Sequence, residues 1–192
     1  MTHISQLKDI SQIQVGYQTK GRVQENIEGT HALIRGSDFD GRHALKAKTL
    51  LSFNPKRDPE PYLVKRGDVL FQARGLDNIA IYLEHSLQKT LAASTFYVVR
   101  IKDREVLPQY ATWWLNQKTA QNYFKSQASG TRMSFISKKT LANMSIPIPP
   151  IRIQEKIIRA SSLLAAERNL CAELAELRGK LVESICTQAV QK

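Results

Sequence analysis

The sequence predicts an α+β protein with two parts, a mainly β domain with flanking helices over residues 1–150 and one long coiled-coil helix over residues 151–192. Two observations predict this fold. From about His31 to Ile101, short runs of β-branched and aromatic residues alternate with turn residues. After Pro150 no proline occurs, and apolar residues recur at helical spacing. A content of 42% hydrophobic residues is enough for one core of ordinary size.

Five strands are expected in the β-rich region, because residues that favour turns interrupt it. Asp40 with Gly41 forms one such break, and Asn54 with Pro55 forms another. Gly67 can supply the positive φ that a tight turn before a strand requires. The expected strands cover residues 31–35, 45–53, 68–73, 78–83 and 95–101.

A helix is expected from Pro108 to about Gln127, since proline suits the first position of a helix. Apolar and aromatic side chains share one face of it, namely Tyr110, Trp113, Trp114, Ala120, Tyr123 and Phe124. We interpret this face as core packing, with stacking of tryptophan on nucleic-acid bases as the alternative. Ser137 and Thr140 then predict a short helical turn, after which the prolines of residues 146–150 impose extended backbone.

The helix expected over residues 151–192 is too long to lie on a domain of this size. At 1.5 Å per residue it would measure about 60 Å. It carries two apolar stripes, and one helix cannot bury both by itself. We therefore expect it to pair with another helix. The stripe residues are Ile157, Leu163, Leu164, Leu170, Leu174, Leu177, Leu181 and Ile185.

The composition indicates a cytoplasmic protein that does not enter a membrane. No apolar run approaches the ~20 residues that cross a bilayer, and Lys8 and Asp9 interrupt the start of the chain where a signal peptide would be apolar. Cys171 and Cys186 would lie about 22 Å apart along the helix, too far for a mutual disulfide. We expect both to be reduced thiols in a core.

Positive charge is concentrated in the expected domain. The chain has a net charge of +11, and residues 1–150, with 21 Lys and Arg against 12 Asp and Glu, carry +9. No acidic residue occurs between Glu105 and Glu155, and a second basic stretch runs from Arg35 to Arg57. Because neutralised phosphates release condensed counterions, two basic segments on one fold are typical of nucleic-acid binding. A merely basic surface is the alternative.

Motifs for catalysis or for cofactor binding do not occur in the sequence. The four histidines lack metal-site spacing, and the glycines form neither a dinucleotide fingerprint nor a phosphate loop. Asp38 and Asp40 could hold a metal ion in a nuclease, but we interpret them as turn residues. The loop of residues 129–132 is either a phosphate-binding concavity or an ordinary helix end. The chain is therefore expected to bind a partner rather than to catalyse a reaction.

Several short motifs follow one another in a specific order along nearly the whole chain. Residues 64–70 precede Pro108, Tyr110 and Leu115, and a Gly-Thr loop at residues 129–131 comes next. The last stretch contains Ile136, Ser137, Leu141, Ile146, Pro147, Ile148, Pro149, Pro150, Ile151, Gln154 and Ile157. Together these motifs resemble the specificity subunits of type I restriction-modification systems, which carry DNA target-recognition domains joined by long helices.

The resemblance implies a non-catalytic subunit of a host-defence complex that recognises double-stranded DNA and recruits modification (methyltransferase) and restriction subunits. It implies no cofactor on this chain, with S-adenosylmethionine, ATP and Mg on the partner subunits. The candidate DNA contacts, chosen by charge and by position in loops or at strand ends, are Arg35, Lys46, Lys48, Arg74, Lys125, Thr131, Arg132, Lys138 and Lys139.

Two features depart from the family pattern. Ile153 stands where an acidic residue usually precedes the glutamine that corresponds to Gln154. Family members also typically carry two recognition domains and two long helices, whereas this chain has one of each. We therefore expect a homodimer of half-length subunits with antiparallel helices. Its two-fold axis predicts a bipartite, palindromic DNA site.

Two other functions stay open on the sequence. A small Mg-dependent DNA nuclease would use Asp38, Asp40 and Asp68 as carboxylate ligands. A basic scaffold protein would use its helix to join another complex and its charge to bind RNA or an acidic partner. Metal-dependent cleavage would favour the nuclease, and competition between duplex DNA and structured RNA would separate the DNA reader from the scaffold.

Overall fold

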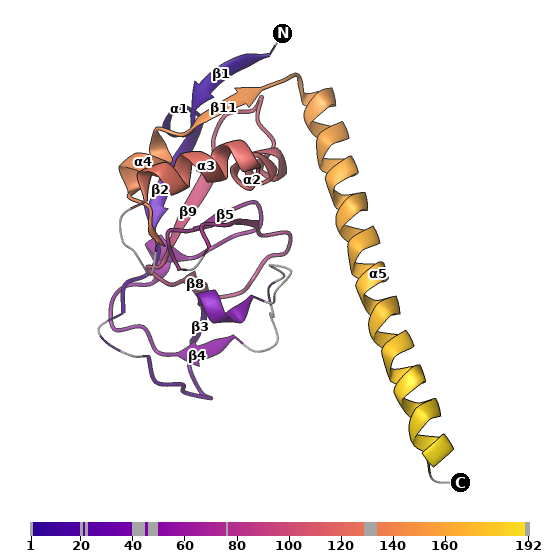
Figure 1. Cartoon of the computed structure of the whole chain (residues 1–192). Helices are drawn as coiled ribbons and strands as arrows, with labels where there is room; N and C mark the ends of the chain where they lie inside the picture. Colours follow the sequence, from indigo (N-terminus) through magenta and orange to yellow (C-terminus); the bar gives the residue numbers. More distant parts are fainter. Residues whose placement is uncertain are drawn as a thin grey trace. The chain divides into compact units, whose positions relative to one another are not determined.

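The chain divides into two units, a folded domain and a long helix (Figure 1). The computed structural model describes residues 2–19, 21, 23–39, 45, 50–75, 77–128 and 134–190. The first unit runs from Met1 to Gln154 and the second from Glu155 to Lys192. None of the helices formed by the described residues is long and apolar enough to span a bilayer.

A four-stranded antiparallel sheet with the order β2-β9-β5-β7 forms the centre of the first unit. Its strands are β2 (Ser11–Val15), β9 (Phe96–Ile101), β5 (Val69–Gln72) and β7 (Ala80–Tyr82). Val69, Leu70 and Phe71 of β5 are all completely buried, so both faces of the sheet are covered. On one face the ring of Phe71 lies 4.9 Å from that of Phe124.

That face is covered by two helices, α2 (Pro108–Leu115) and α3 (Lys118–Gln127) (Figure 1). The expectation of one continuous helix is wrong, because the chain breaks between them at Asn116. The side-chain amide of Asn116 pairs with the backbone of Ala80 in β7, donating to its carbonyl at 2.7 Å and accepting from its N–H at 2.9 Å. This contact with an edge strand accompanies the end of α2.

The aromatic face of α2 and α3 packs into the domain and also fixes the backbone that follows. Hydroxyl and indole groups donate to main-chain carbonyls, from Tyr110 to Pro147 at 2.6 Å, from Trp114 to Ser145 at 3.0 Å and from Tyr123 to Thr140 at 3.0 Å. Tyr110, Ala120 and Phe124 are buried. The expected core packing is confirmed for these three, whereas Trp113, Trp114 and Tyr123 are half-buried. The polar ends of the rings position the segment before the long helix.

A three-stranded sheet with the order β4-β3-β8 covers the other face of the central sheet. Its strands are β4 (Leu51–Phe53), β3 (His31–Ile34) and β8 (Thr90–Ala92), with β3 antiparallel to β4 and parallel to β8. Ile34 packs in one core cluster with Leu70 and Val98 of the central sheet. Leu33, on the opposite side of β3, packs with Tyr17 in a second cluster.

Short strand pairs and single turns complete the first unit. The pairs are β1 (His3–Gln6) with β11 (Ser145–Ile148) and β6 (Arg74–Gly75) with β10 (Ser134–Phe135). The turns are α1 (Leu7–Ile10), α4 (Lys138–Ala142), η1 (Gly36–Asp38) and η3 (Glu60–Tyr62). Ser137 caps α4, since its Oγ accepts from the N–H of Thr140 at 3.0 Å, which confirms the expected helical turn.

The long helix α5 (Ile151–Val190) begins inside the first unit. Gln154 in its first turn is completely buried. Its Oε1 accepts from the N–H of Leu107 at 2.9 Å, and its Nε2 donates to the carbonyls of Glu105 at 2.7 Å and Pro149 at 2.8 Å. Because both ends of the amide are satisfied, the start of α5 is fixed to the domain.

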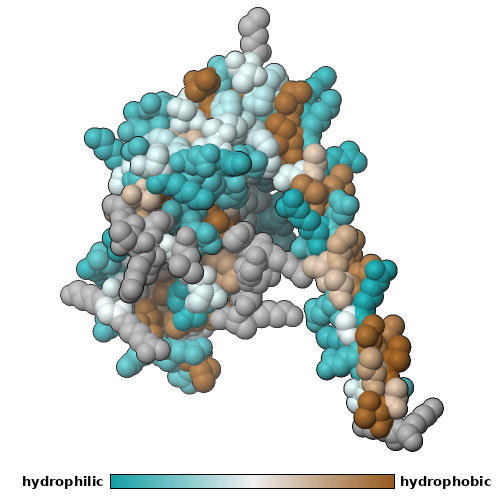
Figure 2. All heavy atoms as spheres, viewed as in Figure 1, coloured by the Kyte–Doolittle hydropathy of each residue, from teal (hydrophilic) through white to brown (hydrophobic). Residues whose placement is uncertain are grey.

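From Glu155 onward α5 exposes its apolar side chains. Figure 2 shows hydrophobic side chains along the helix next to hydrophilic ones. Of the eight predicted stripe residues, Ile157 is half-buried, and the other seven are between 47% and 67% exposed in the single chain. Cys171 and Cys186 are exposed free thiols, so the expectation of core thiols is wrong for the single chain.

The predicted α+β architecture is confirmed, with differences in single elements. Strands β3, β5, β7 and β9 lie within the expected ranges, and Gly67 has the expected positive φ, +94°. Of the strand expected over residues 45–53, Leu51–Phe53 is observed, and residues 46–49 lie outside the described part. Strands β1, β2 and β8 were not expected.

Gly16 lies where two backbones meet, and its replacement tests this close approach. Its N–H donates to the carbonyl of Phe96 at 2.9 Å, and a Cβ would collide with the carbonyl oxygens of Ala92 and Ala93. Because backbone atoms cannot move aside as a flexible side chain can, we expect Gly16→Ala to lower the free energy of unfolding by about 2–3 kcal/mol. Urea denaturation followed by tryptophan fluorescence measures this loss.

Gly179 in α5 supplies the matched control. No atom lies within 4 Å of the position that its Cβ would take, and alanine is favoured over glycine in a helix by about 1 kcal/mol. Gly179→Ala is therefore expected not to lower the urea midpoint. A Gly16→Ala protein that unfolds at the wild-type midpoint would mean that the two backbones can separate without loss.

Candidate nucleic-acid interface

Five of the nine predicted DNA contacts lie in the part of the chain that the structure describes. They are Arg35, Arg74, Lys125, Lys138 and Lys139. The other four, Lys46, Lys48, Thr131 and Arg132, lie outside the described residues, as does the candidate phosphate loop at residues 129–132. The placement of the five therefore defines the candidate interface.

Arg74 is held on the short ribbon of β6 and β10. It pairs with Phe135 across the ribbon, and its guanidinium lies 4.7 Å from the centre of the Phe135 ring. This stacking keeps the exposed cation in one orientation. The Tyr97 hydroxyl donates to the carbonyl of Ile136 at 3.0 Å. Burial raises the pKa of Tyr97 above its ordinary value, and the nearby charge of Arg74 opposes the rise.

Lys138 and Lys139 begin α4 and are both exposed. The N–H of Ile136 donates to the carbonyl of Ala73 at 2.9 Å, so the segments that carry Lys138 and Arg74 are neighbours. Lys125 is exposed in the last turn of α3, and α3 contacts α4. These four cations therefore lie on neighbouring segments of the domain, although they come from separate positions in the sequence.

The segment that carries Arg35 lies near the segment that carries Arg74. A Cβ on Gly36 would lie 3.3 Å from the Gln72 amide nitrogen, and a Cβ on Gly75 would collide with that nitrogen. The glycines that follow Arg35 and Arg74 are therefore both close to the Gln72 side chain. We call Arg35, Arg74, Lys125, Lys138 and Lys139 the basic surface.

The Arg35 guanidinium is already paired inside the chain. It donates to Asp38 from Nη2 at 2.8 Å and from Nε at 3.2 Å, and its side chain is 39% exposed. The hydrogen bond to Asp38 raises the pKa of Arg35 above its ordinary value, the charges of Asp38 and Glu25 add to the rise, and burial opposes it. Arg35 is thus a pre-oriented cation with a partly neutralised charge.

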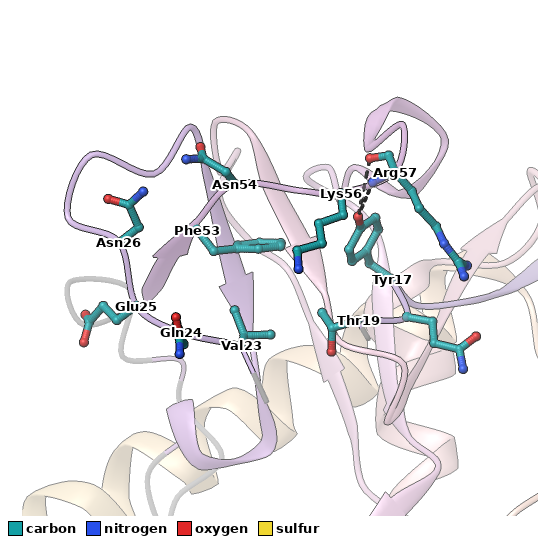
Figure 3. Close-up of a pocket in the computed structure, with 11 residues that line it drawn as sticks. Tyr17, Thr19, Val23, Gln24, Glu25, Asn26, Phe53, Asn54, Lys56 and Arg57 are labelled. Carbon is teal, nitrogen blue, oxygen red and sulfur yellow. Dashed lines mark hydrogen bonds between the residues drawn. The ribbon is translucent and has the colours of Figure 1, made fainter. Parts of the chain in front are cut away.

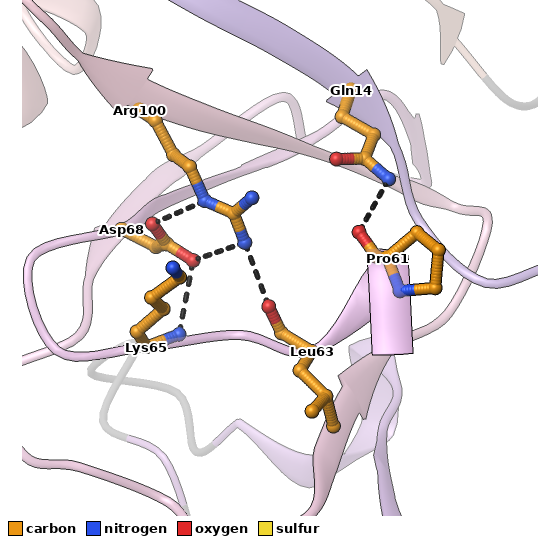
Figure 4. A network of polar contacts seen from close by, with 6 residues as sticks. All are labelled: Gln14, Pro61, Leu63, Lys65, Asp68 and Arg100. Carbon is orange, nitrogen blue, oxygen red and sulfur yellow. Dashed lines mark hydrogen bonds and ion pairs between the residues drawn. The ribbon is translucent and has the colours of Figure 1, made fainter. Parts of the chain in front are cut away.

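Two of the three carboxylates considered for a nuclease, Asp38 and Asp68, are bound to arginine side chains. Asp38 is 4% exposed and accepts from the Arg35 backbone N–H at 2.7 Å as well as from its guanidinium. Asp68 accepts from Arg100 and from the backbone of Lys65 (Figure 4). Asp40 lies outside the described residues, among which no group of three metal-ligating side chains occurs. Asp38 and Asp68 therefore hold loops in place.

A polar pocket that the sequence did not predict lies next to β4. Its volume is about 710 Å³, and Figure 3 shows most of the side chains that line it. Two segments far apart in the sequence build it, one after β2 and one after β4. The lining residues are Tyr17, Gln18, Thr19, Val23, Gln24, Glu25, Asn26, Phe53, Asn54, Lys56 and Arg57. The signals in the sequence were the amide residues Gln18, Gln24 and Asn26 in one segment and Asn54 with Lys56 and Arg57 in the other.

The chain matches the family model of the type I restriction modification DNA specificity domain over residues 3–170. No curated protein matches it. Similar solved structures include a type I restriction-modification S subunit from M. genitalium, at 14% identity and a TM-score of 0.62. An HsdS subunit from Thermoanaerobacter tengcongensis shares 18% identity at a TM-score of 0.61. A chain from a structural study of assembly and conformational transition of the type I R-M system shares 22% at 0.58.

These matches cover most of this chain but less than half of the solved chains. They cover 94%, 86% and 92% of this chain, and 43%, 38% and 43% of the other chains. At these identities the structures show the common fold. The chain therefore spans about two fifths of the length of the solved chains that it matches.

Proposed function

Because the chain belongs to the family of type I restriction-modification DNA specificity domains, we propose that it gives such a complex its DNA target sequence. The domains of this family specify the target and are not catalytic. The match over residues 3–170, with the same fold in the solved subunits, carries the proposal. The basic surface supports it, because its cations come from neighbouring segments, namely α3, α4, β6 and the residue before η1.

In the proposed mechanism each subunit has a separate role. The domain settles on the phosphates of double-stranded DNA through Lys and Arg, and it reads base edges with side chains in its loops. Modification subunits would bring S-adenosylmethionine, and a restriction subunit would use ATP and Mg. This chain would hold none of these cofactors. Residues 1–150 are the proposed recognition domain, and residues 151–192 the proposed helix for pairing and for docking of the modification subunits.

We also propose that α5 pairs with the α5 of a second copy. Exposed leucines along one side, among them Leu163, Leu170 and Leu177, support this, because a solvated helix seldom carries so continuous an apolar stripe. The chain spans about two fifths of the length of the solved subunits, and pairing would bring a second domain and a second long helix together with the first. A two-fold axis would place two identical domains on a bipartite palindrome.

A selection experiment tests the proposed function. The full chain is mixed with a pool of random duplexes, and bound DNA is recovered and sequenced over several rounds. We expect enrichment of a split palindrome with a constant spacer, and retention of a type I modification subunit by the same chain. A pool that stays random after selection would contradict the proposal, as would equal preference for A-form RNA.

Lys138→Ala separates phosphate contact from base reading. If Lys138 neutralises one phosphate, its loss should weaken all duplexes alike and lower the slope of log K against log salt by about one unit. Fluorescence anisotropy at several salt concentrations measures the slope. Lys102→Ala is the control, because Lys102 is exposed just beyond β9 and outside the basic surface. An unchanged slope for Lys138→Ala would remove this residue from the phosphate contacts.

A further inference from the structure

The polar pocket beside β4 has a rigid frame. The Tyr17 hydroxyl accepts from the backbone N–H of Arg57 at 3.0 Å, and the Tyr17 ring packs edge-on against Phe53 with centres 5.9 Å apart (Figure 3). The opposite wall is joined to β4 by the N–H of Asn26, which donates to the carbonyl of Ser52 at 2.9 Å. The Tyr17 hydroxyl and the backbone of Asn26 thus fix the backbone of both walls.

The amides in the pocket offer unused hydrogen-bonding groups. Asn26 and Asn54 each use Oδ1 to accept a backbone N–H, from Glu28 and from Thr30, both at 3.0 Å. These bonds orient both side chains, and their Nδ2 groups donate to none of the described residues. The amide of Gln24 is exposed and likewise has no partner among those residues. A polar ligand can bind to amide groups that are already oriented and still have unused donors and acceptors.

The remaining groups narrow the class of ligand. Lys56 and Arg57 add positive charge to the pocket, and neither side chain pairs with a described carboxylate. On the adjoining turn Ile27 is 95% exposed, although the N–H of Gly29 closes that turn on the carbonyl of Asn26 at 2.8 Å. Small-molecule sites are mostly apolar and enclosed. Here the exposed amides, Lys56 and the apolar Ile27 lie around an open pocket. Such an arrangement suits the edge of a larger polar molecule better than an enclosed small molecule.

The groups around the pocket match those that read base pairs. In the major groove, amide side chains pair with adenine, Lys and Arg pair with guanine, and apolar groups contact the thymine methyl. The pocket and the Ile27 tip offer all three kinds of group.

We propose that the pocket, with Gln24, Asn26, Asn54, Lys56 and the Ile27 tip, reads base edges in the major groove of duplex DNA. This inference rests on the proposed function. It assigns base reading to the pocket and phosphate contact to the basic surface, two roles that respond differently to sequence and to salt.

Gln24→Ala and Lys56→Met test the proposal in the full chain. Dissociation constants are measured for the selected duplex and for duplexes with each base pair changed in turn, at several salt concentrations. We expect each variant to lose about 5- to 150-fold of its discrimination at one or two base pairs. We also expect Gln24→Ala to keep the wild-type salt slope. Ile27→Ser should relax the preference at a position occupied by thymine.

Matched controls lie outside the pocket. Gln12 is exposed on β2 and Lys102 just after β9, and neither lines the pocket. Gln12→Ala and Lys102→Met should keep the full preference, and circular dichroism with the urea midpoint checks that each variant is folded. If both pocket variants keep the wild-type preference at every base pair, the inference is overturned while the proposed function stands. If the wild type itself shows no preference, the proposed function fails and the inference fails with it.

Discussion

If α5 pairs with a second copy as proposed, Leu174→Glu is expected to convert the dimer into a monomer. Leu174 is 49% exposed in the single chain and lies in the middle of the apolar stripe. In a paired helix, a glutamate there would lose its hydration without gaining a partner. An uncompensated charge of this kind costs about 3–5 kcal/mol, which raises the dissociation constant of the dimer by at least about 100-fold. Sedimentation equilibrium measures the change.

Loss of the dimer should also change how the protein binds DNA. A monomer carries one domain, so it should bind half of the split palindrome and be indifferent to the spacer. Ala172→Glu is the matched control. At 3.6 residues per turn, Ala172 lies on the face of α5 that also carries the ion pair of Glu176 with Lys180, at 2.7 Å. It should remain dimeric. A Leu174→Glu protein that sediments as a dimer would exclude this stripe as the interface.

Asp68→Ala is expected to lower the free energy of unfolding by about 3 kcal/mol. Asp68 is 4% exposed, and its oxygens accept from Arg100 at 2.9 and 3.1 Å and from the N–H of Lys65 at 3.0 Å. Arg100 also donates to the carbonyl of Leu63 at 2.7 Å, so the pair joins β9 to the loop before β5 (Figure 4). Removing the carboxylate leaves a largely buried guanidinium without its counter-charge.

A double-mutant cycle shows whether the loss comes from the pair. Asp68→Ala together with Arg100→Met removes both charges, so the double variant should be more stable than the sum of the single losses predicts. Urea denaturation gives all four free energies. Asp58→Ala is the control, because its exposed carboxylate accepts from the N–H of Glu60, and it should cost about 1 kcal/mol or less. Additive losses at Asp68 and Arg100 would contradict an interaction between them.

Local patterns in the sequence predicted those elements that local chemistry determines. The apolar spacing after Pro150 predicted α5, and Ser137 predicted the cap of α4. The positive φ of Gly67 follows from the turn that it makes. In each case the residues that determine the structure lie within one or two turns of chain. The buried role of Gln154 could be anticipated only from its place in the family motif.

Long-range contacts explain what the sequence did not predict. Strand β1 pairs with β11, which is more than 130 residues away, and no local alternation marks either strand. The break between α2 and α3 depends on Asn116 meeting Ala80. A pattern search on a single helix cannot detect that contact.

In the candidate site, too, local sequence predicted some residues, while others depend on long-range contacts. Charge along the sequence predicted five cations that the structure describes, and the contacts of Ile136 with Ala73 and of α3 with α4 make the segments of four of them neighbours. The pocket depends on Tyr17 reaching Arg57, forty positions along the chain. No local pattern signals such a meeting. Which of the predicted cations touch DNA stays a prediction.

The hydrogen bonds behind the pocket fix its backbone, and the exposed side chains on that backbone can vary. The walls are held by the bond of Asn26 to Ser52 and by the Tyr17 hydroxyl at Arg57, and neither tie involves the side chains of Gln24 and Lys56. Exchanges at such exposed positions usually alter stability by less than about 0.5 kcal/mol. Natural variants can therefore drift through many side-chain combinations at these points while the scaffold persists. If the pocket reads bases, new specificities become evolutionarily accessible by single substitutions.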